Sequence, residues 1–115
     1  MDLRKAKRIG REWKKQGGEI RVVMEDGGEL DRYELSEAIK RYLIRTDRDE
    51  ANGIVRTASF VGRDGAERTI RWVSPGAYTL STPSGEYEYS STKIEEYMRK
   101  QRGAEFVLRT GEEGR

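Results

Sequence analysis

The sequence predicts a single α+β domain in which about three helices pack on one antiparallel, meander-type sheet. The chain has 115 residues, which is room for one domain with one modest core. Apolar residues recur at three- and four-residue steps in three segments, whereas they alternate with a period of two between residues 54 and 90. Short turn motifs separate the alternating segments, and connections of that length join antiparallel neighbours. We therefore expect one domain over residues 1–115, in the order helix, strand, short strand, helix, four strands, helix, strand.

The first predicted element is an amphipathic helix within residues 1–17. Its apolar side consists of five residues that fall within an arc of about 120° on a helical wheel: Leu3, Ala6, Ile9, Gly10 and Trp13. Gly17 and Gly18 supply a stop signal after it, so the predicted helix spans Asp2–Lys15.

The other side of this helix carries seven basic residues, which are the candidate binding residues of the chain: Arg4, Lys5, Lys7, Arg8, Arg11, Lys14 and Lys15. Only Asp2 and Glu12 oppose them, although the whole protein has a net charge of just +2. Seven like charges with little i,i+4 pairing are suited to binding phosphates or an acidic partner. The plainer alternative is a solvated helix face that keeps the protein soluble.

The segment after the double glycine is predicted as a strand and then a helix. Glu19–Met24 has the apolar content of a strand, and a turn signal at Asp26-Gly27-Gly28 follows it. Glu29–Tyr33 is a candidate for a short returning strand. Ser36 is expected to cap a helix whose apolar residues follow helical spacing: Leu35, Ala38, Ile39, Tyr42 and Leu43.

A polar loop is expected over Thr46–Gly53, and the period of two begins after it. Four short strands separated by turn residues are predicted there: Ile54–Val61, Arg68–Val73, Ala77–Thr82 and Glu86–Ser90. Glu105–Thr110 is predicted as the last strand, at an exposed edge if the sheet stays open, with residues 111–115 as a flexible tail.

The third predicted helix lies between the last two strands. Thr92 and Glu95 form a capping-box pattern at its start, and Gly103 marks its end. Its last turns carry the bases Arg99, Lys100 and Arg102, which complement the helix dipole and require no functional explanation.

The aromatic residues of the four-strand region are predicted to be core residues. Alternation places them on the faces that also carry the aliphatic side chains: Phe60, Trp72, Tyr78, Tyr87 and Tyr89. The opposite faces carry Thr, Ser, Arg and Glu. This pattern argues against a base-stacking platform made of these rings.

Composition excludes several classes of site. The chain has no Cys and no His, so disulfides, thiol nucleophiles, zinc fingers and histidine bases are all absent. Asp47 and Asp49 resemble the start of a calcium loop, but Ala51 and Asn52 occupy its fifth and sixth positions. We expect no catalytic residues, metal or cofactor. With no apolar stretch of membrane-spanning length and no signal peptide, a cytoplasmic protein without a membrane partner is expected.

Three functions remain open at this stage. The leading expectation is a non-catalytic interaction protein that docks on a protein or nucleoprotein partner through its charged surface, as small regulators or inhibitors of phages and mobile elements do. The first alternative is direct binding of nucleic-acid phosphates through the basic face of the N-terminal helix. The second alternative is an enzyme whose residues form no recognisable motif. The sequence predicts neither the identity of the partner nor the oligomeric state.

Overall fold

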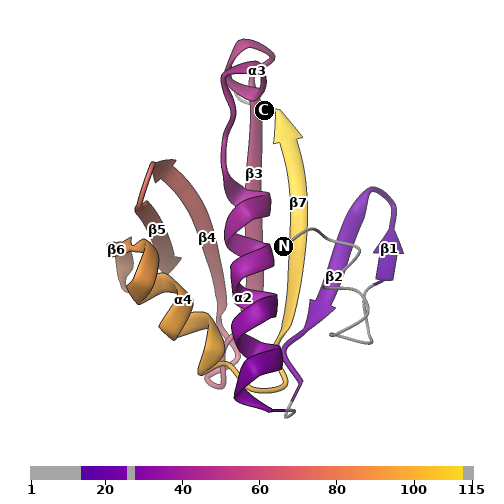
Figure 1. Ribbon diagram of the computed structural model, residues 1–115, viewed down its shortest axis with the longest axis vertical. Helices are drawn as coiled ribbons and strands as arrows, with labels where there is room; N and C mark the ends of the chain where they lie inside the picture. Colours follow the sequence, from indigo (N-terminus) through magenta and orange to yellow (C-terminus); the bar gives the residue numbers. More distant parts are fainter. Residues whose placement is uncertain (1–13, 26–27, 113–115) are drawn as a thin grey trace.

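The computed structural model describes residues 14–25 and 28–112, which form a two-layer α+β domain (Figure 1). Its strands are β1 (Lys14–Gln16), β2 (Glu19–Val23), β3 (Ile54–Val61), β4 (Glu67–Ser74), β5 (Ala77–Thr82), β6 (Gly85–Ser90) and β7 (Glu105–Glu112). Its helices are α2 (Glu29–Leu43), α3 (Asp47–Ala51) and α4 (Ser91–Arg99). No helix in these ranges is long and apolar enough to cross a membrane.

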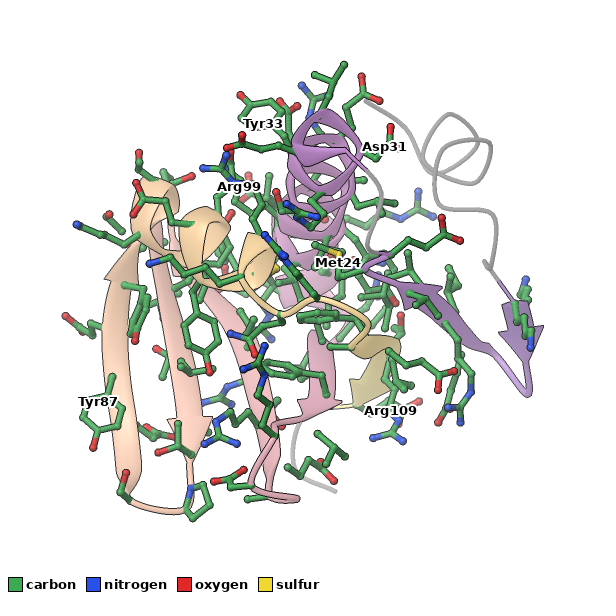
Figure 2. All side chains as sticks on the ribbon, turned by 90° about the horizontal axis from the view of Figure 1, so that it is seen from below. Met24, Asp31, Tyr33, Tyr87, Arg99 and Arg109 are labelled. Carbon is green, nitrogen blue, oxygen red and sulfur yellow. The ribbon has the colours of Figure 1, made fainter. Side chains whose placement is uncertain are left out.

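All seven strands form one antiparallel sheet in the order β1-β2-β7-β3-β4-β5-β6. The predicted fold class is therefore confirmed, including the meander from β3 to β6. The strands β3 and β5 have the predicted bounds, because alternation within a hairpin is a local signal. The helices α2 and α4 pack on the same face of the sheet, and among the described residues no helix covers the other face (Figures 1 and 2).

The core lies between that face and the two helices. Its fully buried side chains include Leu35 and Ile39 of α2, Ile94 and Met98 of α4, and Phe106 of β7. The rings of Phe60 and Phe106 lie 4.5 Å apart at the centre of the sheet. Burial of these apolar groups is what attaches the helices to the sheet.

The helix α2 begins at Glu29, earlier than predicted, since the predicted cap residue is Ser36. Glu29–Tyr33 is its first turn and not a returning strand, with Gly28 as the N-cap residue. The acidic side chains Glu29 and Asp31 favour this start, because they complement the positive end of the helix dipole. Ser36 is not a cap but a buried residue within α2, and its hydroxyl donates a 2.8 Å hydrogen bond to the Tyr33 carbonyl.

The N-terminal prediction is only partly within the described residues. Residues 1–13 lie outside them, whereas Lys14–Gln16 forms β1, so the helix prediction is wrong for Lys14 and Lys15. Gly17 and Gly18 have φ angles of +58° and +85° and form the β1–β2 turn instead of ending a helix. Positive φ values cost glycine little, which explains this tight reversal.

Two local predictions around the other helices are also wrong. The expected polar loop contains α3, whose cap residue Thr46 and third residue Asp49 form a capping box. In α4 the cap is Ser90, whose hydroxyl accepts a 3.2 Å hydrogen bond from the Lys93 amide, and Thr92 is the second residue of the helix. The predicted cap of α4 is thus displaced by two residues, because hydroxyl side chains cluster at helix starts.

The last strand is central and not at an edge. β7 pairs with β2 on one side and with β3 on the other, and its pairing extends to Gly111 and Glu112 of the predicted tail. The edges of the sheet are β1 and β6. Pairing between strands far apart in the sequence leaves no local signal, so this position could not be predicted.

Candidate functional site

Three hollows adjoin one another around the C-terminal end of α4, the end of the molecule that faces the viewer in Figure 2. The helix hollow, of about 510 Å³, lies between the start of α2 and the end of α4. The turn hollow, of about 450 Å³, lies between the end of α4 and the β3–β4 turn. The tyrosine hollow, of about 400 Å³, lies between that turn and the β5–β6 turn. Lys100 lines the first two hollows and Tyr97 the last two, so they form one surface, which we call the α4 surface.

The helix hollow is lined by four cations and two carboxylates. The cations are Arg32, Arg99, Lys100 and Arg102, and the carboxylates are Glu29 and Glu96. They come from the first turn of α2 and the last residues of α4, two segments that the buried stripes of both helices hold side by side. The net charge of this hollow is therefore positive.

Arg99 is held only loosely within this hollow. Its guanidinium lies 3.9 Å from Glu29 and 4.0 Å from Glu95, at the outer limit of an ion pair. The same group lies over the Tyr33 ring, 5.3 Å from its centre, and Figure 2 shows these two side chains together. Its Nε has no hydrogen-bond acceptor among the described residues. Arg99 thus has one N–H donor that no other described residue accepts.

The turn hollow adds a cation from a different part of the chain. Arg63 projects from the β3–β4 turn, where Gly65 has a φ angle of +81° and the Asp64 carboxylate accepts a 3.1 Å hydrogen bond from the Ala66 amide. Arg63, Lys100 and Arg102 are exposed and make no ion pair with any described residue. Their charges are therefore available to a ligand.

The turn hollow and the tyrosine hollow share a tightly paired Arg68 and Asp64. Two parallel hydrogen bonds of 2.7 and 3.0 Å join the guanidinium to the carboxylate. These bonds, with the Ala66 amide, lower the pKa of Asp64 to about 2. A Cβ at Gly62 would collide with the Arg68 guanidinium, so glycine leaves the space in which the pair lies. This arginine is neutralised, in contrast to Arg63.

The tyrosine hollow is lined by three rings. Tyr97 of α4 packs edge-on against Tyr89 of β6 at 5.7 Å and against Phe60 at 6.0 Å, and burial raises the pKa of its hydroxyl. Tyr87 differs from these two rings, because 46% of it is exposed. Its hydroxyl lies 3.1 Å from the Ser84 hydroxyl of the β5–β6 turn.

The aromatic prediction therefore holds for most rings but fails for Tyr87. Phe60 and Tyr78 are buried, and Trp72 and Tyr89 pack against the core. Tyr87 shares their face of the sheet, yet it lies on the edge strand β6 beyond the reach of the helices. Alternation predicts the face of a side chain but not whether a helix covers it.

The seven residues predicted to bind a partner do not contribute to the α4 surface as far as the structure describes them. Arg4, Lys5, Lys7, Arg8 and Arg11 lie outside the described residues. Lys14 and Lys15 lie on β1, at the opposite edge of the sheet from β6. Since neighbouring strand residues point to opposite faces, these two lysines do not share one basic face. Their binding role stays a prediction.

Sequence reasoning did not find the α4 surface. It assigned Arg99, Lys100 and Arg102 to the helix dipole, and it left Arg63 in a turn. The sequence feature that could have indicated this surface is the number of basic residues near the end of α4. Their convergence with Arg32 and Arg63 depends on tertiary packing.

The remaining polar clusters are better explained by the fold. Lys40 of α2 pairs with Glu95 of α4 at 2.5 Å and donates a 3.0 Å hydrogen bond to the Ser91 hydroxyl. The ion pair and this hydrogen bond join α2 to α4, which accounts for these three side chains. Within the described ranges, no group of acidic side chains is arranged to hold a metal ion.

Comparison of the chain with protein-family models, with curated proteins and with solved structures finds no match. The chemistry of the α4 surface is therefore interpreted from its own residues. It offers a net positive charge, three cations without an ion-pair partner among the described residues (Arg63, Lys100 and Arg102), and a cluster of tyrosines at one end.

Proposed function

We propose that this protein is a non-catalytic nucleic-acid-binding protein that contacts phosphates through the α4 surface. The observation that carries the proposal is the convergence of cations from three separate segments. Arg32 comes from α2, Arg63 from the β3–β4 turn, and Lys100 and Arg102 from the end of α4. Six cations and three carboxylates line the three hollows together.

The arrangement of these cations suits an extended anion. They follow two adjoining hollows and do not point into one enclosed pocket, so an anion with charges at intervals would meet more of them than a single phosphate would. Placing like charges near one another brings no stability in the absence of a ligand. Contacts of this kind provide the sequence-independent part of nucleic-acid affinity.

Docking on an acidic protein or a nucleoprotein is the second candidate, and it was the leading expectation from the sequence. The same cations would serve it, and Arg and Tyr are enriched in protein interfaces. An exposed ring at one end of the surface favours nucleic acid, because bases stack on such rings. Tyr87 is 46% exposed and lies in the tyrosine hollow.

The test measures binding of the full chain to fluorescent DNA and RNA oligonucleotides by anisotropy at several salt concentrations. With three unpaired cations engaged, log affinity should fall with log salt at a slope of about −2.7 for duplex DNA and −2.1 for a single strand. Replacing Arg63, Lys100 and Arg102 together by Glu should abolish binding and leave the thermal midpoint nearly unchanged, since all three are exposed.

A matched control carries the same three charge reversals elsewhere. Arg41, Arg48 and Lys93 are also exposed, and none of them lines the α4 surface. This variant should bind almost as well as the unchanged protein. Absence of binding to any nucleic acid at low salt overturns the proposal, as does equal loss of affinity in both variants. Binding to polyglutamate without binding to nucleic acid would support the docking candidate instead.

A further inference from the structure

The tyrosine hollow is not needed for binding phosphates. Arg68 is its only cation among the described residues, and the two hydrogen bonds that Arg68 donates to the Asp64 carboxylate neutralise that charge. The rest of its lining is mostly aromatic, aliphatic or hydroxyl-bearing, including Leu80, Pro83 and Thr82. Such a lining suits a flat, partly apolar group with hydrogen-bonding edges, and a nucleobase is a group of that kind.

The rings of this hollow are held in place before any ligand binds. Tyr89 and Tyr97 meet at 78°, edge to face, and Tyr97 is backed by Phe60. Tyr87 is positioned by the contact of its hydroxyl with Ser84, whose own hydroxyl lies 3.0 Å from that of Thr82. The entropy lost on stacking a base there is reduced because the rings are already ordered.

The unpaired cations adjoin this hollow on one side only. Arg63 and Lys100 line the turn hollow, which shares Arg68 and Tyr97 with the tyrosine hollow. A base stacked on Tyr87 would thus have its neighbouring phosphate groups near Arg63 and Lys100. In a duplex the bases are paired and stacked on one another, so no base could enter.

We infer that the nucleic acid bound by the α4 surface is single-stranded, with one base stacked on Tyr87 in the tyrosine hollow and the adjoining phosphates over Arg63 and Lys100. The inference rests on the proposed function and adds to it the class of nucleic acid. Recognition by stacking tolerates all bases, so weak sequence preference is expected.

Tyr33 provides a matched control for Tyr87. The two residues have similar exposures, 41% and 46%, but Tyr33 lines none of the three hollows, and the Arg99 guanidinium covers its ring. Figure 2 places Tyr33 near the start of α2, well away from Tyr87 on β6. A general loss of surface aromatic area would affect both variants equally.

The experiment compares a single strand of about 12 nucleotides with its duplex, a length that at ~3.4 Å per nucleotide spans the 38 Å long axis of the protein. The unchanged protein should bind the single strand more tightly. Tyr87→Ala should weaken single-strand binding by about 5- to 100-fold, the loss of one base–aromatic stack, with duplex binding unchanged. Tyr87→Phe, which keeps the ring, and Tyr33→Ala should bind within about twofold of the unchanged protein.

The outcomes separate the inference from the proposed function. If Tyr87→Ala binds the single strand like the unchanged protein, or the duplex binds as tightly as the single strand, the inference is wrong. The proposed function would still stand in either case, provided that the reversal of Arg63, Lys100 and Arg102 abolishes binding. If neither nucleic acid binds at low salt, both are wrong. Thermal melting of each variant confirms that it is folded.

Discussion

The two ends of α4 use charged residues in opposite ways. At its N-terminal end, Lys40 and Glu95 form a short ion pair whose side chains are only 15% and 11% exposed, and Lys40 also donates to Ser91. At its C-terminal end, Lys100 and Arg102 are exposed and have no ion-pair partner among the described residues. Charges of the first kind join α4 to α2, whereas those of the second kind are open to a ligand.

This difference shows how one short helix can serve both the fold and a binding surface. A buried ion pair requires both partners, because an isolated charge in a protein interior is costly. The absence of a partner costs an exposed cation little free energy, since water solvates its charge. The distribution of charge along α4 therefore separates residues whose loss should unfold the protein from those whose loss should affect only binding.

The largest effect on stability is expected from breaking the pair at the N-terminal end. Lys40→Ala leaves Glu95 with only the Arg99 guanidinium, 4.0 Å away, and should reduce the free energy of unfolding by about 2–3 kcal/mol, somewhat below the cost for a fully buried pair. Urea denaturation measures this loss. The double variant Lys40→Met, Glu95→Gln removes both charges and should recover most of it. A double variant as unstable as Lys40→Ala would assign the loss to packing and not to charge.

A smaller effect on stability is expected from removing the N-cap side chain of α4. Ser90→Ala removes the acceptor of the Lys93 amide and should cost about 1 kcal/mol of unfolding free energy. Thr92→Ala, at the position where the sequence pattern predicts the cap, should cost less because Thr92 is exposed and already inside α4. Equal losses in the two variants, measured by thermal or urea denaturation, would contradict the assignment of Ser90 as the cap.

The smallest effect concerns the tight Arg68–Asp64 ion pair beside the C-terminal end of α4. Because Arg68 lowers the pKa of Asp64 from its ordinary 3.8 to about 2 in the folded state, the carboxylate adds stability above pH 3.8. That contribution is lost as the pH falls through about 2. The thermal midpoint of Asp64→Asn should therefore lie below that of the unchanged protein at neutral pH and approach it in acid. Glu67→Gln, an exposed neighbour without an ion pair among the described residues, should show no such convergence.

Local sequence patterns predict where many helices and strands of this fold lie, but they do not predict which segments pack beside them. The strands Ile54–Val61 and Ala77–Thr82 were predicted with their bounds because alternation and turn residues are local signals. Glu29–Tyr33 was mistaken for a strand since a five-residue segment has too few residues to distinguish the two periods. The lysines of β1 were predicted in a helix for a similar reason, because helical spacing was extended up to the glycines that form the β1–β2 turn.

The candidate site could not be predicted in the same way. Arg99, Lys100 and Arg102 appear in the sequence as ordinary bases at a helix end, and Arg63 as an ordinary turn residue. What distinguishes them is their place around the same hollows, and Arg63, Lys100 and Arg102 also lack an ion-pair partner among the described residues. Both properties depend on neighbours that are distant along the chain.

By itself the sequence determined the α+β class, the antiparallel meander, the core faces of the four meander strands and the absence of cysteine and histidine chemistry. Periodicity and composition carry that information, because each residue's preference for water or the interior acts locally. Only the tertiary structure decided that β7 lies at the centre of the sheet, that Tyr87 stays exposed on an edge strand, and that cations from α2, a turn and α4 meet on one surface. Those features follow from long-range packing, in which the position of a side chain is set by the segments that lie beside it.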